Sequence, residues 1–195
     1  MKIFILCGSI AHKSHTRSLL YYIESLLTEK GVETVFWDLL SKPLPIALPE
    51  FHKNPLKNPN ESVKEFAKEI IYSDGFVLGS PLYHGSYSGV LKNALDNLHY
   101  DAFKNKPVAL VSNSSAIRNC AHPCEHLCLV VRAIYGYVLQ SQIGTCGDDY
   151  EEKKNAYELK DKEIKDRTER MVDELVKFAD ILRKNPISKI SGSQI

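Results

Sequence analysis

Short apolar segments alternate with amphipathic segments along nearly the whole chain, and this alternation constrains the fold more than any other feature. The short apolar runs are typical of buried strands, whereas the segments between them repeat apolar residues three and four positions apart, as on one face of a helix. Strands that alternate with helices pair in parallel through right-handed crossovers, with helices on both faces of the sheet. We therefore predict an α/β fold with a doubly wound, five-stranded parallel sheet.

The element boundaries follow from the same pattern. The predicted strands cover residues 2–7, 33–38, 75–80, 107–112 and 138–144, and the predicted helices cover residues 14–30, 60–72, 88–98, 122–135 and 148–183. Residues 151–165 are interpreted as a charged, solvated face of the last helix. Residues 41–59 carry five of the nine prolines and are predicted to form a loop without a helix. We expect one domain over residues 1–184 and a polar tail over residues 185–195.

Charge and hydropathy narrow the class of function. The formal net charge of +1 disfavours binding to nucleic acid or to a membrane surface, which usually requires a basic excess. No apolar run reaches the roughly 18 residues of a transmembrane helix, and the N-terminal apolar run is too short for a signal-peptide core. We therefore expect a cytoplasmic protein.

The five cysteines are odd in number and irregularly spaced, which favours reduced thiols over a disulfide framework. Cys120, Cys124 and Cys128 recur every fourth residue and are predicted to share one helix face. The outer two sulfur atoms would then lie roughly 12 Å apart, too far for one metal ion to bind all three. We expect these cysteines to be buried as small apolar side chains, with a redox pair as the alternative, and we predict no metal site.

The loop after the first predicted strand, residues 8–17, is rich in hydroxyl and basic groups and leads into a helix. Ser9, Ser14 and Thr16 carry hydroxyls, and Lys13 or Arg17 can balance a negative charge. Backbone N–H groups at a helix N-terminus suit a phosphate dianion. The pattern matches neither the nucleoside-triphosphate loop nor the dinucleotide fingerprint. The alternative is that Ser14 only caps the helix and the basic side chains are solvated.

The loop after the third predicted strand, residues 79–89, offers groups that suit a planar heterocycle. Pro81 constrains the turn out of the strand, and Gly85 allows the backbone to approach a ligand closely. Leu82, Tyr83 and His84 are expected to present an apolar and aromatic edge with free backbone N–H groups.

Together these loops carry the patterns G-S-x-x-x-x-S-x-T and S-P-x-Y-x-G-S-x-x-G-x-L-K-N-A-L-D, and the chain thereby resembles the NAD(P)H-dependent FMN reductases of the flavodoxin-like superfamily. The resemblance implies a flavodoxin-like sheet with strand order 2-1-3-4-5 and FMN as the cofactor. It places the FMN phosphate at Ser9, Ser14, His15, Thr16 and Arg17. It places the ring along Pro81, Leu82, Tyr83, His84, Gly85 and Ser86. Backbone N–H groups of the loop at Asn113, Ser114 and Ser115 are expected to stabilise negative charge on the reduced ring.

The segment from Tyr83 to Gly89 is similar to the subgroup that supplies reduced FMN to two-component flavin monooxygenases. In that subgroup the second tyrosine lies near the flavin at a subunit interface, which makes Tyr87 the candidate for that role; the alternative is that Tyr87 is an ordinary surface residue in the first turn of a helix. The resemblance also implies a homodimer or homotetramer paired through the helix that contains Leu91, Asn93, Leu95 and Leu98. The chain departs from the family at Ala11, where many members have arginine. It also departs at residues 112–116, which are usually glycine-rich, so flavin is expected to be held differently or loosely enough to leave.

The resemblance further implies that a nicotinamide, NADPH by analogy or else NADH, stacks on FMN and transfers hydride to the flavin N5. No obligatory acid or base side chain is then expected. Candidate acceptors are free FMN, quinones, azo dyes, chromate and iron chelates. Two alternatives remain: a flavodoxin-type electron carrier, although flavodoxins are usually strongly acidic, and a flavin-free binding module on the same fold.

Overall fold

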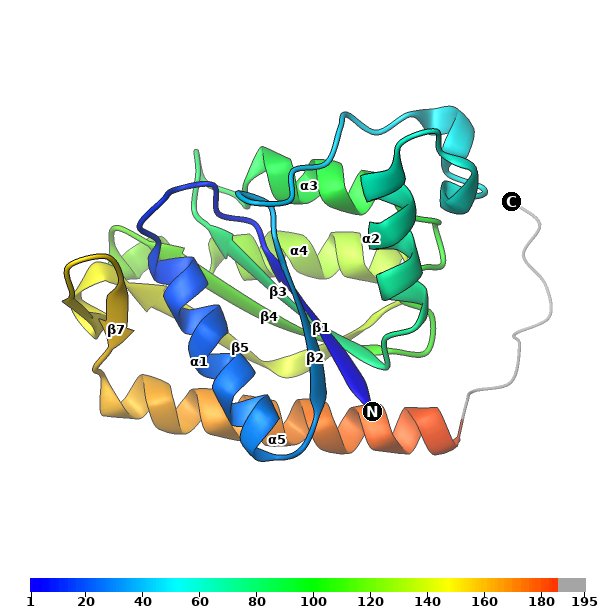
Figure 1. Cartoon of the computed structure of the whole chain (residues 1–195). Coiled ribbons are helices and arrows are strands. Elements are labelled where there is room, and N and C mark those ends of the chain that lie inside the picture. The colour runs from blue at the N-terminus through cyan, green and yellow to red at the C-terminus, as the bar shows by residue number, and fades with distance from the viewer. Residues whose placement is uncertain (186–195) are drawn as a thin grey trace.

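A computed structural model describes residues 1–185 and confirms the predicted sheet. Five parallel strands lie in the order β2-β1-β3-β4-β5 (Figure 1). Their bounds are β1 (Lys2–Cys7), β2 (Glu33–Asp38), β3 (Gly75–Pro81), β4 (Pro107–Ser114) and β5 (Tyr137–Cys146). β4 and β5 are longer than predicted at their carboxyl ends, and those extensions carry Asn113, Ser114 and Thr145 to the edge of the sheet.

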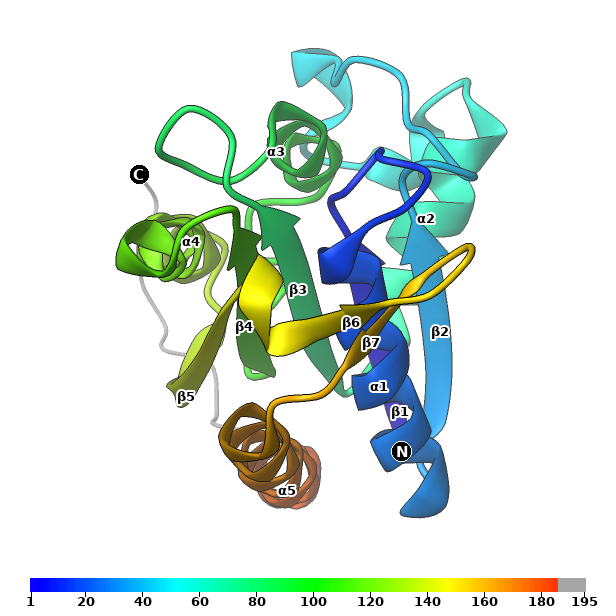
Figure 2. The same ribbon diagram turned by 90° about the vertical axis from the view of Figure 1, so that its left-hand side faces the viewer.

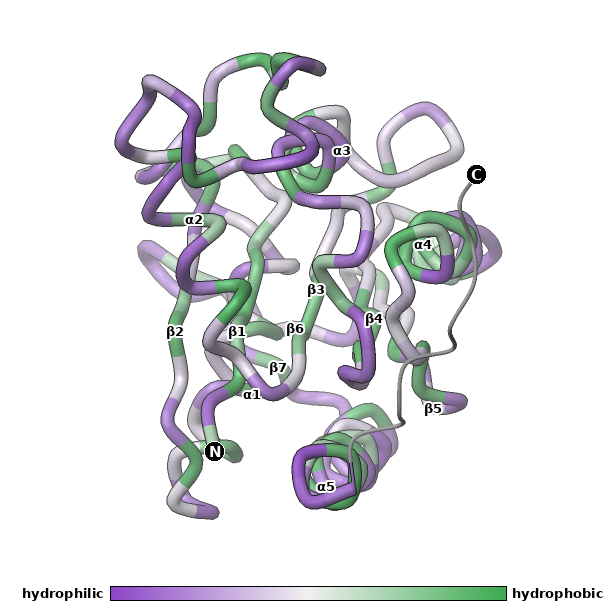
Figure 3. The backbone as a smooth tube through the Cα atoms, turned by 90° about the vertical axis from the view of Figure 1, so that its right-hand side faces the viewer, coloured by the Kyte–Doolittle hydropathy of each residue, from purple (hydrophilic) through white to green (hydrophobic). Residues whose placement is uncertain are grey.

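Five helices cover the two faces of the sheet (Figure 2). α1 (His15–Glu29) and α5 (Lys162–Lys184) lie on one face, and α2 (Glu61–Ile71), α3 (Gly89–Asp96) and α4 (His122–Ala133) lie on the other. Because successive side chains of a strand point to opposite faces, β1 contributes to both cores. Ile3 and Ile5 pack with α1 and α5, whereas Phe4 and Leu6 pack with the other three helices. The hydrophobic colour accordingly concentrates in the central strands, and the hydrophilic colour on the outer loops (Figure 3).

The prediction of a helix from residue 148 onward is wrong over its first part. A single 3-10 turn (Gly147–Asp149) is followed by two antiparallel strands, β6 (Tyr150–Glu152) and β7 (Tyr157–Leu159). The high charge content resembles a helix surface, but Tyr157 and Leu159 turn inward two residues apart, as in a strand. α5 begins only at Lys162, where the Asp161 side chain caps it by accepting a hydrogen bond from the N–H of Ile164.

The proline-rich loop was predicted to contain no helix, but two 3-10 turns (Pro49–Phe51 and Pro55–Lys57) interrupt it. Each starts with proline, whose fixed φ suits a first helical position. Amide side chains of α3 hold the preceding segment: Asn93 accepts a hydrogen bond from the N–H of Ala47 and donates one to the carbonyl of Pro45. Within residues 1–185, none of the helices combines the length and the apolar character needed to cross a bilayer. Apart from Asn185, the predicted tail lies outside the described residues.

Candidate functional site

The carboxyl ends of β1, β3 and β4 bring three polar loops to one edge of the sheet, the side that faces the viewer in Figure 2. The strand order reverses between β1 and β3, because β2 lies outside β1 and the later strands lie on the other side. Open parallel sheets bind ligands in the crevice at such a reversal. The topology thus places the two loops that carry the sequence motifs where a ligand site is expected.

The loop after β1 starts from a very close contact between backbones. The N–H of Gly8 donates to the carbonyl of Gly79 at 2.8 Å, and the Ser88 hydroxyl donates to the carbonyl of Gly8 at 2.6 Å. A Cβ atom at residue 8 would lie 2.9 Å from both the Gly79 oxygen and the Leu91 Cβ. Only glycine fits there, so the start of this loop is fixed against both β3 and α3.

Hydroxyl groups and free backbone donors line the remainder of this loop. The Ser14 hydroxyl lies 2.8 Å from the Ser9 hydroxyl and accepts a hydrogen bond from the N–H of Arg17, which makes Ser14 the N-cap of α1. Ser9, Ser14 and Thr16 are all buried. Across the described chain, the backbone N–H groups of residues 9–16 find no hydrogen-bond acceptor. Hydroxyls together with free N–H groups at a helix N-terminus form a cradle that fits a phosphate dianion.

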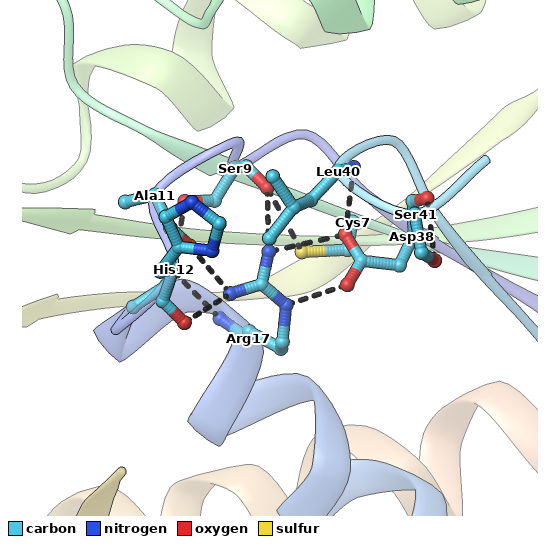
Figure 4. Close-up of polar contacts among 9 residues, drawn as sticks. Cys7, Ser9, Ala11, His12, Arg17, Asp38, Leu40 and Ser41 are labelled. Carbon is cyan, nitrogen blue, oxygen red and sulfur yellow. Dashed lines mark hydrogen bonds and ion pairs between the residues drawn. The ribbon is translucent and has the colours of Figure 1, made fainter. Parts of the chain in front are cut away.

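Arg17 does not point its side chain into this cradle (Figure 4). Its Nε and one Nη atom donate to the two carboxylate oxygens of Asp38, at 2.6 and 3.1 Å. Its other N–H groups donate to the backbone carbonyl oxygens of Ser9 (2.9 Å), Ala11 (2.6 Å) and His12 (3.2 Å). A guanidinium has five N–H donors, and all five are used. The Arg17 side chain therefore has no N–H group left to donate to a ligand and instead lies beneath the loop, where it contacts Asp38 and the loop carbonyls.

Lys13 and His15, the other cationic candidates near the cradle, contact the β6–β7 hairpin instead. Lys13 forms an ion pair with Glu152 and lies over the ring of Tyr157. The imidazole of His15 stacks on Tyr157, with ring centroids 3.6 Å apart, and lies 4.7 Å from the ring of Tyr150. Burial lowers the pKa of His15, so its imidazole is biased toward the neutral form. Sequence analysis missed the hairpin, and the two-residue period of Tyr157 and Leu159 was the signal that could have found it.

The loop after β3 is a tight hairpin. The N–H of Leu82 donates to the carbonyl of Asn113, and Tyr83 and Ser86 exchange two backbone hydrogen bonds. Residues 84 and 85 both have positive φ, 49° and 84°, as a two-residue hairpin turn requires. The expectation of free N–H groups at Leu82 and Tyr83 is therefore wrong, because the hairpin uses both. Tyr83 is nevertheless 43% exposed and presents its aromatic ring to the open edge.

Two further contacts tie the ring-side loops to the rest of the molecule. The Ser86 hydroxyl lies 2.8 Å from the Nδ1 atom of His126 on α4. The amide of Asn113 donates to the Thr145 hydroxyl at 3.1 Å, and the Tyr150 hydroxyl donates to the same oxygen at 3.0 Å. Tyr150 thus connects the hairpin beside His15 to the loop after β4.

The remaining serines of that loop are directed to different places. The Ser114 hydroxyl is hydrogen-bonded to the backbone of Ala116, whereas Ser115 is exposed at the edge. Polar side chains therefore occupy the loop that is usually glycine-rich in the family that the sequence resembles. With Pro81 at the end of β3, every residue predicted for the site lies on one of the three loops, on the strand ends that feed them or on the first turn of α1.

The cysteines lie apart from this arrangement. Cys120 precedes α4, so the prediction that it shares a helix face with Cys124 and Cys128 is wrong. Cys124 is fully buried as predicted, and burial raises its pKa to about 12. Cys128 is only partly buried and accepts a hydrogen bond from Gln142. All five thiols are free, and residues 1–185 hold no cluster of three metal-binding side chains.

Comparisons with known proteins agree with this geometry. Residues 1–148 match the family model described as NADPH-dependent FMN reductase. The chain is 36% identical over 179 residues to an FMN-dependent NADPH-azoreductase of Staphylococcus aureus, which covers 91% of this chain and 95% of the relative. Its fold is similar to that of the apo form of an NADH:FMN oxidoreductase, EmoB, with a TM-score of 0.74, 19% identity and coverage of 95% and 91%. It is also similar to the NAD(P)H:acceptor oxidoreductase FerB of Paracoccus denitrificans, with a TM-score of 0.73, 19% identity and coverage of 92% and 97%.

Proposed function

Because this chain belongs to the NADPH-dependent FMN reductase family, and is thus an NAD(P)H-dependent FMN oxidoreductase, we propose that it holds FMN at the carboxyl edge of β1, β3 and β4 and reduces small aromatic acceptors of the azo or quinone type. The FMN phosphate would occupy the cradle after β1. The isoalloxazine ring would lie between the hairpin after β3 and the loop after β4.

The observation that carries this proposal is the row of unpaired backbone N–H groups at residues 9–16, beside the hydroxyls of Ser9 and Ser14. Ser9, Ser14 and Thr16 in this row are buried residues, and buried polar donors are rarely left without partners in a native protein. An anion at the start of α1 would satisfy them and would also interact with the positive end of the helix dipole. Neither Arg17 nor Lys13 is needed to balance its charge, since each already faces a carboxylate.

When bound, FMN supplies the redox chemistry, accepting hydride from the nicotinamide and passing the electrons on. The protein's part is to bind and orient. The exposed ring of Tyr83 and the N–H groups at the tip of the hairpin, residues 84 and 85, would contact one edge of the flavin. Asn113, held by Thr145, would place its amide at another edge. We predict no obligatory acid or base side chain for reduction of the flavin, because the nicotinamide would supply hydride to it directly.

An azo acceptor is favoured by the long match to an azoreductase, which spans 95% of that relative. A second candidate is transfer of reduced FMN to a flavin-dependent monooxygenase, which the motif from Tyr83 to Gly89 supports. NADPH as the preferred donor, a cytoplasmic location and a homodimer or homotetramer complete the proposal.

The phosphate cradle is tested by Ser9→Asp, which places a negative charge against the phosphate. We expect FMN binding, measured by quenching of flavin fluorescence, to be abolished. The matched control is Ser25→Asp, which adds the same charge to an exposed position of α1 and leaves FMN affinity unchanged. If Ser9→Asp binds FMN like the wild type, the phosphate is not bound at this loop.

The acceptor is tested by anaerobic titration with NADPH and NADH, followed by addition of an azo dye or a quinone. Flavin absorbance should bleach with NADPH and return when either acceptor is added. If turnover instead requires excess FMN and neither acceptor restores the absorbance, the flavin itself is the released product and the monooxygenase role is favoured.

A further inference from the structure

The ion pair between Arg17 and Asp38 is largely shielded from solvent. Arg17 is the one charged residue among the buried residues of the described chain. The Arg17 side chain is 9% exposed and the Asp38 side chain 14% exposed. Charged groups are rarely buried unless they are paired and hydrogen-bonded, because desolvation is costly. Cys7, which lies beside the pair, does not neutralise either charge, since burial raises the pKa of its thiol to about 12 and keeps it protonated. The two charges therefore compensate each other.

The carboxylate of Asp38 is fixed by the sheet. Asp38 is the last residue of β2 and stands opposite Cys7 in the parallel register, level with the start of the phosphate loop. Its Oδ1 atom accepts a hydrogen bond from the N–H of Leu40, and its carbonyl accepts one from the N–H of Lys42. The carboxylate thus has a rigid position from which to orient Arg17.

The guanidinium in turn orients the peptide groups of the loop. It draws the carbonyl oxygens of Ser9, Ala11 and His12 toward itself. In a trans peptide group the N–H points opposite to the carbonyl, and the described chain contains no cis peptide bond. The N–H groups of residues 10, 12 and 13 therefore point away from Arg17. These three N–H groups belong to the row that makes no hydrogen bond within the described chain.

We propose that Asp38 and Arg17 are positioning residues for the FMN phosphate: Asp38 holds Arg17, and Arg17 turns the N–H groups of the loop outward to bind the phosphate. The inference rests on the proposed placement of the phosphate in this loop. It assigns phosphate affinity to oriented backbone dipoles and gives the arginine no direct contact with the ligand. The pair should therefore matter for FMN and much less for riboflavin, which lacks the phosphate.

The test compares the dissociation constants of FMN and riboflavin in Asp38→Asn and in the wild type. Asp38→Asn keeps the shape of the side chain but removes the charge that holds Arg17. We expect FMN binding to weaken at least about tenfold, as for the loss of a charge-assisted hydrogen bond, and riboflavin binding to change less than about threefold. The matched control is Glu152→Gln, which breaks the exposed Lys13 pair of the same loop and should leave both ligands unaffected.

Arg17→Lys provides a second variant in case Asp38→Asn does not fold. The lysine retains the charge but cannot contact three carbonyls and a carboxylate at once. FMN binding should therefore again weaken more than riboflavin binding. Equal weakening of FMN and riboflavin, or no change in either, would overturn the inference. The outcomes for this inference and for the proposed function can be told apart. If Ser9→Asp still binds FMN, the phosphate is not bound in the cradle. If Ser9→Asp loses FMN binding but Asp38→Asn and Arg17→Lys bind FMN normally, only the positioning role is rejected.

Discussion

The two motif-bearing loops of the site are stabilised in opposite ways. The loop after β1 is held from beneath by buried side chains, chiefly Arg17 with Asp38 and Ser14 with Ser9, while its backbone N–H groups stay unpaired. The loop after β3 is held chiefly by its own backbone, through the two hydrogen bonds between Tyr83 and Ser86, while the side chains at its tip, Tyr83 and His84, are exposed. The first arrangement suits a ligand group of fixed shape and charge. The second suits a surface that admits different flat molecules in turn.

Glycine-to-alanine substitution in each loop should show most clearly that the two loops are stabilised in different ways. In Gly8→Ala the new methyl group would lie 2.9 Å from the Gly79 carbonyl oxygen, so backbone must move, and we expect a loss of about 1–3 kcal/mol in the free energy of unfolding. In Gly85→Ala the methyl group meets no atom within 4 Å, and only the positive φ is strained, which costs about 1 kcal/mol.

Urea unfolding of the apo proteins measures both changes, and flavin titration measures their consequence for binding. Gly8→Ala should weaken FMN binding because it displaces the loop after β1, where we propose that the phosphate binds. A larger loss of stability in Gly85→Ala than in Gly8→Ala would show that the loop after β1 is not the more tightly packed of the two.

The connection between the two sides of the site is tested by a pair of tyrosines in the β6–β7 hairpin. Tyr150→Phe removes the hydroxyl that donates to Thr145 in the core and should cost about 1 kcal/mol of stability. Tyr157→Phe is the matched control: its ring also contacts His15, but its hydroxyl has no hydrogen-bond partner among residues 1–185. Thermal unfolding should show a lower Tm for Tyr150→Phe and an almost unchanged one for Tyr157→Phe. Equal shifts would mean that ring packing, and not the Thr145 contact, is what Tyr150 contributes.

The smallest effect is expected at the contact between the hairpin after β3 and α4. His126→Ala removes the exposed hydrogen bond to Ser86, so we expect a change of less than about 0.5 kcal/mol in global stability. Hydrogen exchange at Tyr83 and Ser86 should nevertheless become faster, because the contact with α4 no longer supports the two backbone hydrogen bonds between them. His122→Ala, one turn earlier on the same helix, should leave exchange unchanged. Unchanged exchange in His126→Ala would show that the hairpin is rigid without α4.

Much of the fold could be predicted from the sequence because the relevant signals are local. The apolar run of β1 and the three- and four-residue spacing of Leu19, Leu20 and Ile23 on α1 define their elements without reference to neighbours. The hairpin at residues 150–159 escaped prediction because its strands are three residues long and highly charged. The two-residue period of Tyr157 and Leu159 is a local signal of the second strand, but it is too short to outweigh the helix-like charge pattern around it.

For the site, the sequence by itself determined which loops carry the polar groups, since hydroxyls, a glycine and a helix start within ten residues already indicate an anion cradle. The tertiary structure alone decided what each side chain does there. Arg17 and Asp38 are 21 residues apart, and they meet because β2 pairs with β1 in a register that brings the end of β2 level with the loop after β1. Whether a cationic side chain contacts a ligand or supports the backbone depends on which acceptors lie within hydrogen-bond distance of it. For Arg17, strand pairing places the Asp38 carboxylate within that distance.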